Sequence, residues 1–132
     1  MRIAHAALVL LIAGSWTGCA KEESRSGAEP ARVELVESYL DELEIVVEAA
    51  EGADDAASAE AAAKRVASSS RELERIGREL GGSVRMSLAG VGPAYGARVA
   101  ALERRLDQER MRIGADPLLA KLALALQRVP RM

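Results

Sequence analysis

Six carboxylates recur at helical spacing in the first part of the chain and form its most distinctive polar pattern. They are Glu34, Glu37, Asp41, Glu44, Glu48 and Glu51. Spacings of three and four residues place them along one edge of a helix, where neighbouring like charges cost roughly 0.2–0.5 kcal/mol per pair. Cations beside this edge would offset that cost. The edge is therefore solvated, paired with arginines of a later helix, or used to contact an external cation or partner through Glu37, Asp41, Glu44 and Glu48.

Groups suited to catalysis or tight metal binding are scarce in the same sequence. The sole histidine, His5, lies at the amino terminus, so a di-iron site of the ferritin-like type, which needs histidine three residues after glutamate, is excluded. Ser68, Ser69 and Ser70 have neither histidine nor cysteine to activate them. We expect a protein that is not an enzyme and that holds no metal or dissociable cofactor.

The only cysteine follows an apolar run near the amino terminus. Arg2 and His5 precede apolar residues 6–14, and small residues then lead to Cys19. This order is typical of a secretory signal. The apolar run has about nine residues, whereas a membrane-spanning helix needs roughly 20, so the pattern favours export and cleavage over a permanent span.

Thr17, Gly18 and Cys19 resemble the lipobox of bacterial lipoproteins, although the family usually has leucine where this chain has Trp16. The resemblance implies cleavage before Cys19 and a covalent lipid, with acyl chains such as palmitate, on that cysteine. Ala20 resembles the residue that permits release to the outer membrane, which implies anchoring at its periplasmic face. The alternative is ordinary signal cleavage after Ala20.

These signals divide the chain into three parts. We expect a signal peptide over 1–18, a lipidated cysteine and flexible tether over 19–29, and a helical domain over 30–132. The tether is polar and lacks apolar periodicity. Removing 18 of 132 residues leaves 114, enough for one small core and too few for two.

Charge is distributed unevenly over the exported part. It carries 17 basic and 20 acidic residues, so we expect no nucleic-acid partner. Residues 29–55 have ten carboxylates and one arginine, whereas residues 83–132 have nine basic and four acidic residues. We expect these two segments to attract each other.

Apolar periodicity predicts the first two helices. After Pro30, which suits a first turn, the apolar positions are Val33, Val36, Leu40, Leu43, Val47 and Ala50. We expect Gly52 to end this helix in the left-handed conformation and Asp54 or Asp55 to cap the next. The second helix, over 55–80, has the stripe Ala62, Val66, Ser69, Leu73, Ile76 and Leu80. The short link predicts an antiparallel hairpin.

Glycines and prolines delimit the remaining elements. Gly81 and Gly82 should stop the second helix, and residues 83–92 are a short helix or a turn. A third helix is predicted from Pro93 to Gly114, with the stripe Tyr95, Val99, Leu102, Leu106 and Ile113. Asp116 and Pro117 should start a short fourth helix whose apolar positions are Leu118, Leu119, Leu122, Leu126 and Val129.

Two surface features each have two interpretations. Leu118, Leu119, Leu122, Leu124 and Leu126 cover more than one face of the fourth helix, so this helix offers a partner surface or closes the bundle. Arg110, Met111 and Arg112 form a basic patch for anionic headgroups, or an ordinary surface paired with Asp107 and Glu109.

Residues 57–66, Tyr95 and residues 112–117 resemble uncharacterised alanine-rich helical bacterial lipoproteins, a resemblance that supports export and fold and implies no functional residue. We predict an all-α protein, an antiparallel helical hairpin extended to a three-to-four-helix bundle. Its expected function is that of a lipid-anchored envelope adaptor or structural component with an envelope protein partner. The alternative is an envelope module that binds cations or a small ligand at the acidic edge of the first helix.

Overall fold

The computed structural model describes residues 30–81 and 84–131, and every regular element within them is helical. The chain divides into a unit of residues 1–30 and a compact unit of residues 31–132. The predicted signal peptide, Cys19 and the tether lie outside the described residues. The fold class is therefore all-α, as the apolar periodicity predicted.

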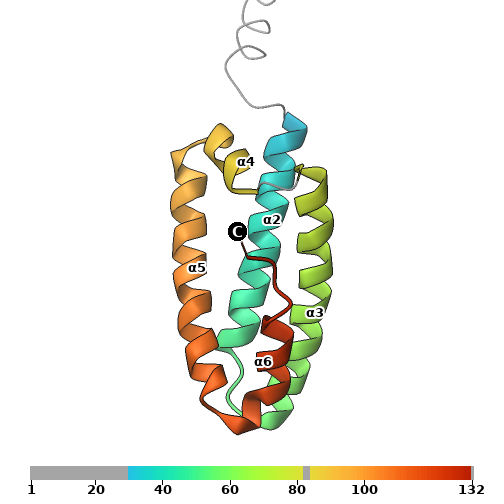
Figure 1. Cartoon of the computed structure of the whole chain (residues 1–132), viewed down its shortest axis with the longest axis vertical. Coiled ribbons are helices and arrows are strands. Elements are labelled where there is room, and N and C mark those ends of the chain that lie inside the picture. The colour runs from blue at the N-terminus through green and yellow to red at the C-terminus, as the bar shows by residue number, and fades with distance from the viewer. Residues whose placement is uncertain (1–29, 82–83, 132) are drawn as a thin grey trace, which may run out of the picture. The chain divides into compact units, whose positions relative to one another are not determined.

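The first two helices are α2 (Pro30–Glu51) and α3 (Ala56–Glu79), which run antiparallel (Figure 1). Asp55 caps α3: its carboxylate accepts the Ser58 backbone N–H at 2.7 Å, and Ser58 Oγ accepts the Asp55 backbone N–H at 3.1 Å. This reciprocal capping box satisfies two otherwise unpaired donors of the first turn. Of the two predicted caps, Asp55 is therefore the one that starts the helix.

α2 ends immediately before Gly52, as predicted, but the prediction that Gly52 adopts the left-handed conformation is wrong. Among the described glycines only Gly81 and Gly92 have positive φ. The Gly52 N–H instead donates to the Glu48 carbonyl at 3.0 Å, and the Ala53 N–H donates to the Ala50 carbonyl at 3.3 Å. Ala53 is buried, so helical hydrogen bonding continues until this side chain reaches the core, and no reversal at Gly52 is needed.

Two glycines with positive φ bracket the connection between α3 and the next long helix. Gly81, at φ 86°, follows α3 as predicted, and Gly92, at φ 143°, precedes Pro93. Between them lies α4 (Val84–Val91), the short helix of the two predicted alternatives. The Ser87 hydroxyl donates to the Leu80 carbonyl at 3.4 Å, which ties α4 to the end of α3.

The last part of the fold comprises α5 (Pro93–Gly114), the 3₁₀ turn η1 (Pro117–Leu119) and α6 (Ala120–Leu126). The Asp116 carboxylate accepts the Leu118 N–H at 3.0 Å, as expected for a cap followed by a first-turn proline. The predicted fourth helix therefore begins as a 3₁₀ turn. It ends before Val129, which is nevertheless buried.

The helices form two parallel pairs. Contacts between α2 and α5 join residues of increasing number on both helices, from Glu37 and Tyr95 to Glu51 and Arg105. Lys121 of α6 pairs with Glu60 near the start of α3, and these two helices ascend side by side (Figure 1). The chain therefore passes through α4 to place α5 beside α2.

One apolar cluster draws on every described helix and is filled mainly by alanine, valine, leucine and isoleucine, with Tyr39 as its buried aromatic ring. All six predicted stripe residues of α3 are buried. Three core positions of α2, Tyr39, Val46 and Ala49, lie outside its predicted stripe, because α2 is covered by neighbours on more than one side.

Candidate functional site

The carboxylate edge of α2 faces the arginines of α5. Arg98 Nη2 donates to Asp41 Oδ1 at 2.9 Å and to Glu44 Oε2 at 2.8 Å. Arg105 binds Glu51 through two parallel hydrogen bonds of 2.8 Å each. The expectation that arginines of the third helix flank this edge is therefore confirmed.

The two helices also meet through groups that are not ion pairs. The Tyr95 hydroxyl donates to Glu37 Oε1 at 2.9 Å, and Arg112 Nη2 donates to the Ala50 carbonyl at 2.9 Å, near the end of α2. The sequence pattern placed Tyr95 on an apolar stripe and did not indicate its polar contact. Its position one turn before Arg98 was the available signal. We call the α2–α5 contacts of Glu37, Asp41, Glu44, Glu51 and their partners the acidic seam.

Hydrogen bonds within the acidic seam shift the pKa values of Arg98 and Glu51 so that the charged form of each group is favoured. Hydrogen bonds to Asp41 and Glu44 raise the pKa of Arg98, and the hydrogen bonds from Arg105 lower the pKa of Glu51. Both arginine side chains keep more than a third of their surface exposed, so water screens each pair and its contribution to stability is small.

Three of the four carboxylates proposed for external contacts are engaged inside the fold. Glu37, Asp41 and Glu44 bind Tyr95 or Arg98, whereas Glu48 is exposed and has no hydrogen bond or ion pair with the described residues. An external cation that bound Asp41 or Glu44 would have to displace Arg98. Within residues 30–81 and 84–131, no group of three or more His, Cys, Asp or Glu side chains is placed to hold a metal ion.

The basic surface near the end of α5 is paired along its own helix. Arg110 donates to Asp107 at 3.2 Å, and Arg112 donates to Glu109 at 2.7 Å. Met111 between them is exposed. Of the two interpretations of this segment, the salt-bridged helix surface describes the structure.

The leucines of the fourth helical segment divide between two faces. Leu119, Leu122 and Leu126 are buried and close the bundle, whereas Leu118 and Leu124 are 64% and 62% exposed. Both interpretations of this segment therefore hold for different residues. The exposed positions Leu118, Lys121, Leu124 and Arg128 recur at spacings of three and four, so apolar and cationic side chains alternate along the outer face.

This outer face borders a shallow groove of about 330 Å³ between α3 and α6. Its floor is formed by the small or apolar side chains of Ala63, Ala67, Leu124 and Ala125. Its charged residues are Glu60, Lys64, Lys121 and Arg128. We call this surface the α3–α6 groove. Sequence reasoning singled out Leu124 but missed the alanines and lysines, which come together only when α6 lies parallel to α3.

Only some of the charged side chains around the α3–α6 groove are paired within the fold. Lys121 Nζ pairs with Glu60 Oε2 at 3.2 Å. Lys64 and Arg128 make no ion pair with the described residues, although the positive charge of Lys64 contributes, after that of Lys121, to the lowered pKa of Glu60. The groove thus combines an apolar floor with an excess of positive charge.

The remaining predicted site residues, Thr17, Gly18 and Cys19, lie outside the described residues. None of the described helices has the length and apolar character needed to cross a membrane. Comparison with protein-family models, curated proteins and solved structures found no match to the chain.

Proposed function

We propose that this chain is a lipid-anchored protein of the bacterial cell envelope that acts as a non-catalytic adaptor. The anchor is the lipid expected on Cys19, at the periplasmic face of the outer membrane, and the partner surface is the α3–α6 groove. The observation that carries the adaptor role is the exposed outer face of the segment from η1 to the residues after α6, where Leu118 and Leu124 alternate with Lys121 and Arg128.

The chemistry of the groove favours one kind of partner, an amphipathic helix with acidic flanks. Ala63 and Ala67 lie one turn apart on α3 and allow a close approach of another helix. Leu124 offers apolar contact, and Lys64 and Arg128 attract carboxylates. A helix that lays its apolar side on the alanines would bring its acidic flanks to these cations.

Photocrosslinking in cells tests the partner surface. A benzophenone side chain at position 124 should capture one specific envelope protein, and the same group at Ala101, an exposed position of α5, should not. Charge reversal by Lys64→Glu together with Arg128→Glu should abolish the crosslink from position 124. An equal yield of the same product from position 101, or a crosslink insensitive to charge reversal, would contradict the proposal.

The anchor has its own test. Cys19→Ser should release the protein from the membrane fraction, and mass spectrometry of the wild-type protein should show an acylated amino-terminal Cys19. An unmodified amino terminus at Lys21 would reject lipidation and favour the alternative cleavage after Ala20. Because the crosslink can be measured with either form, failure of the anchor does not hide failure of the partner surface.

A further inference from the structure

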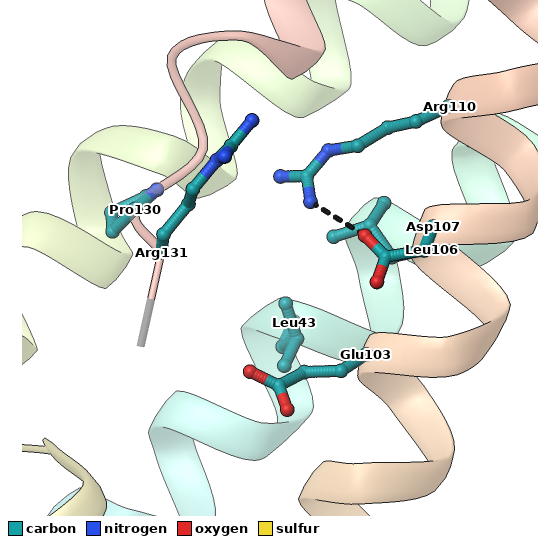
Figure 2. Close-up of a pocket in the computed structure, with 7 residues that line it drawn as sticks. All are labelled: Leu43, Glu103, Leu106, Asp107, Arg110, Pro130 and Arg131. Atoms are coloured by element: carbon teal, nitrogen blue, oxygen red, sulfur yellow. Dashed lines mark hydrogen bonds and ion pairs between the residues drawn. The ribbon is translucent and has the colours of Figure 1, made fainter.

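A pocket of about 270 Å³ lies on another side of the bundle, between α2, α5 and the segment that follows α6 (Figure 2). Leu43, Leu106 and Pro130 form its apolar lining. Its charged lining consists of Glu103, Asp107, Arg110 and Arg131. Neither the acidic seam nor the α3–α6 groove includes any of these residues.

Two guanidinium groups point toward each other across this pocket (Figure 2). Arg110 uses one hydrogen bond, to Asp107 at 3.2 Å, and Arg131 makes no ion pair or hydrogen bond with the described residues. Each guanidinium has five N–H donors, so most of them are available. Two facing cations also repel each other, and an anion between them would remove that repulsion.

The same two arginines also line an adjoining hollow of about 210 Å³ beside Ala123 and Leu126. They therefore stand where two hollows meet, with space on both sides of the guanidinium groups. Planar guanidinium groups bind carboxylates through paired N–H···O hydrogen bonds. This position suits a carboxylate better than a large apolar group.

Glu103 supplies the opposite charge at another point of the pocket lining. Its carboxylate has no hydrogen bond or ion pair with the described residues, and Figure 2 shows it apart from both guanidinium groups. Burial, and then the negative charge of Glu103, raise the pKa of the Tyr39 hydroxyl. An unpaired carboxylate in a partly enclosed pocket favours a cationic group beside it.

The spacing along α5 keeps the two kinds of charge apart. Glu103 and Arg110 are seven residues apart, so their backbone positions are separated by about 10.5 Å along the helix. Leu106 lies between them on the same side and is buried, as is Leu43 of α2. A ligand that joins the two ends must therefore carry several apolar carbon atoms between its charges.

We propose that this pocket binds a small zwitterion, with its carboxylate between Arg110 and Arg131, its ammonium group at Glu103 and its hydrocarbon part over Leu43, Leu106 and Pro130. The volume lies just below the range of roughly 300–1,000 Å³ typical of drug-sized ligands, which fits a molecule of this size. The proposal is independent of the adaptor role, because it uses a different surface.

Titration of the full chain with 6-aminohexanoate, followed by NMR of the backbone amides, tests this site. The amides of residues 103–110, 126–129 and 131 should shift together, with a dissociation constant on the order of 1 mM. Hexanoate and hexylamine, which each keep one charge on the same hydrocarbon, should bind about threefold more weakly. Absence of shifts at these residues, or equal affinity for hexanoate, would overturn the proposal.

Three variants test the contribution of each charged residue of the pocket to ligand binding. Arg131→Gln and Arg110→Gln should each weaken both carboxylates about threefold, because each removes one guanidinium. Glu103→Gln should remove the preference for 6-aminohexanoate over hexanoate while leaving hexanoate affinity unchanged. Arg85→Gln, on the exposed side of α4, is the matched control and should change neither. Equal weakening by Arg85→Gln would mean a general charge effect and would reject the site.

Discussion

The acidic seam and the α3–α6 groove both lie between parallel helices, yet the fold uses charge differently in each. In the acidic seam, Arg98 and Arg105 form ion pairs with carboxylates of α2, so these opposite charges are paired within the domain. At the α3–α6 groove, Lys64 and Arg128 have no ion pair with the described residues, and the helices are held by buried leucines beneath. The comparison shows that the most prominent charge pattern of a sequence can serve to hold two helices together. A surface with a weaker sequence pattern, here the α3–α6 groove, remains available for binding.

The largest effect should come from the buried side of α6. Leu122 is fully buried, so Leu122→Ala should lower the free energy of unfolding by about 2–5 kcal/mol through lost burial and a cavity. Leu124→Ala, on the exposed side, is the control and should change it by no more than about 0.5 kcal/mol. Urea unfolding followed by circular dichroism measures both. Similar losses for the two variants would mean that α6 has no separate structural and exposed faces.

A polar group inside α3 gives the next effect, with the opposite sign. The Ser70 hydroxyl is buried without a hydrogen-bond partner among the described residues. Ser70→Ala should therefore stabilise the protein by about 1 kcal/mol, through higher helix propensity and the loss of an unsatisfied group. Ser68→Ala, exposed on the same helix, should show only the propensity gain of about 0.5 kcal/mol. A destabilising Ser70→Ala would show that this hydroxyl has a structural partner.

The acidic seam should be less sensitive than the core. Arg98→Gln removes the ion pairs to Asp41 and Glu44, and because these groups are partly exposed the cost should be about 0.5–1 kcal/mol. The cost should decrease in high salt, which screens exposed charges. Thermal unfolding at low and high ionic strength measures it. A loss as large as that of Leu122→Ala would place the seam, rather than the apolar core, at the centre of stability.

The smallest effect is the pH dependence of one ion pair. Because Arg105 lowers the pKa of Glu51 below its ordinary value of 4.5, this pair stabilises the fold above that pH and loses its contribution as pH falls below it. The difference in stability between wild type and Arg105→Gln should therefore be larger near neutral pH than at an acidic pH below 4.5, and it should shrink as the pH falls. Urea unfolding at the two pH values checks this. A difference that grows in acid would contradict the pairing.

Local rules predicted much of the fold, because its signals are close in sequence. Asp55, Gly81 and Asp116 act at the helix ends to which capping and turn rules assigned them. Gly52 was misjudged because the burial of Ala53, a tertiary effect, decides how α2 ends. The buried stripe of α3 was predictable because one side of that helix faces the core.

The sites were less predictable, since they depend on which helices become neighbours. The opposite charges of residues 29–55 and 83–132 indicated the acidic seam, but no local signal gives the parallel order of α3 and α6. The pocket requires Pro130 and Arg131 to return toward Leu43 of α2, although these residues are more than 80 positions apart in the chain. Contacts of this kind follow from the assembled bundle and from no short motif.

The passage through α4 has a consequence for how the protein folds. Every contact of the acidic seam closes a loop of more than 50 residues, whereas the cap of α3 joins residues three apart. Closing a long loop costs entropy before its contacts can form and offset that cost, so we expect the seam to form late in folding. Contacts that form after the transition state slow unfolding and hardly affect the refolding rate. Arg98→Gln should therefore speed unfolding in stopped-flow measurements and leave the refolding rate almost unchanged.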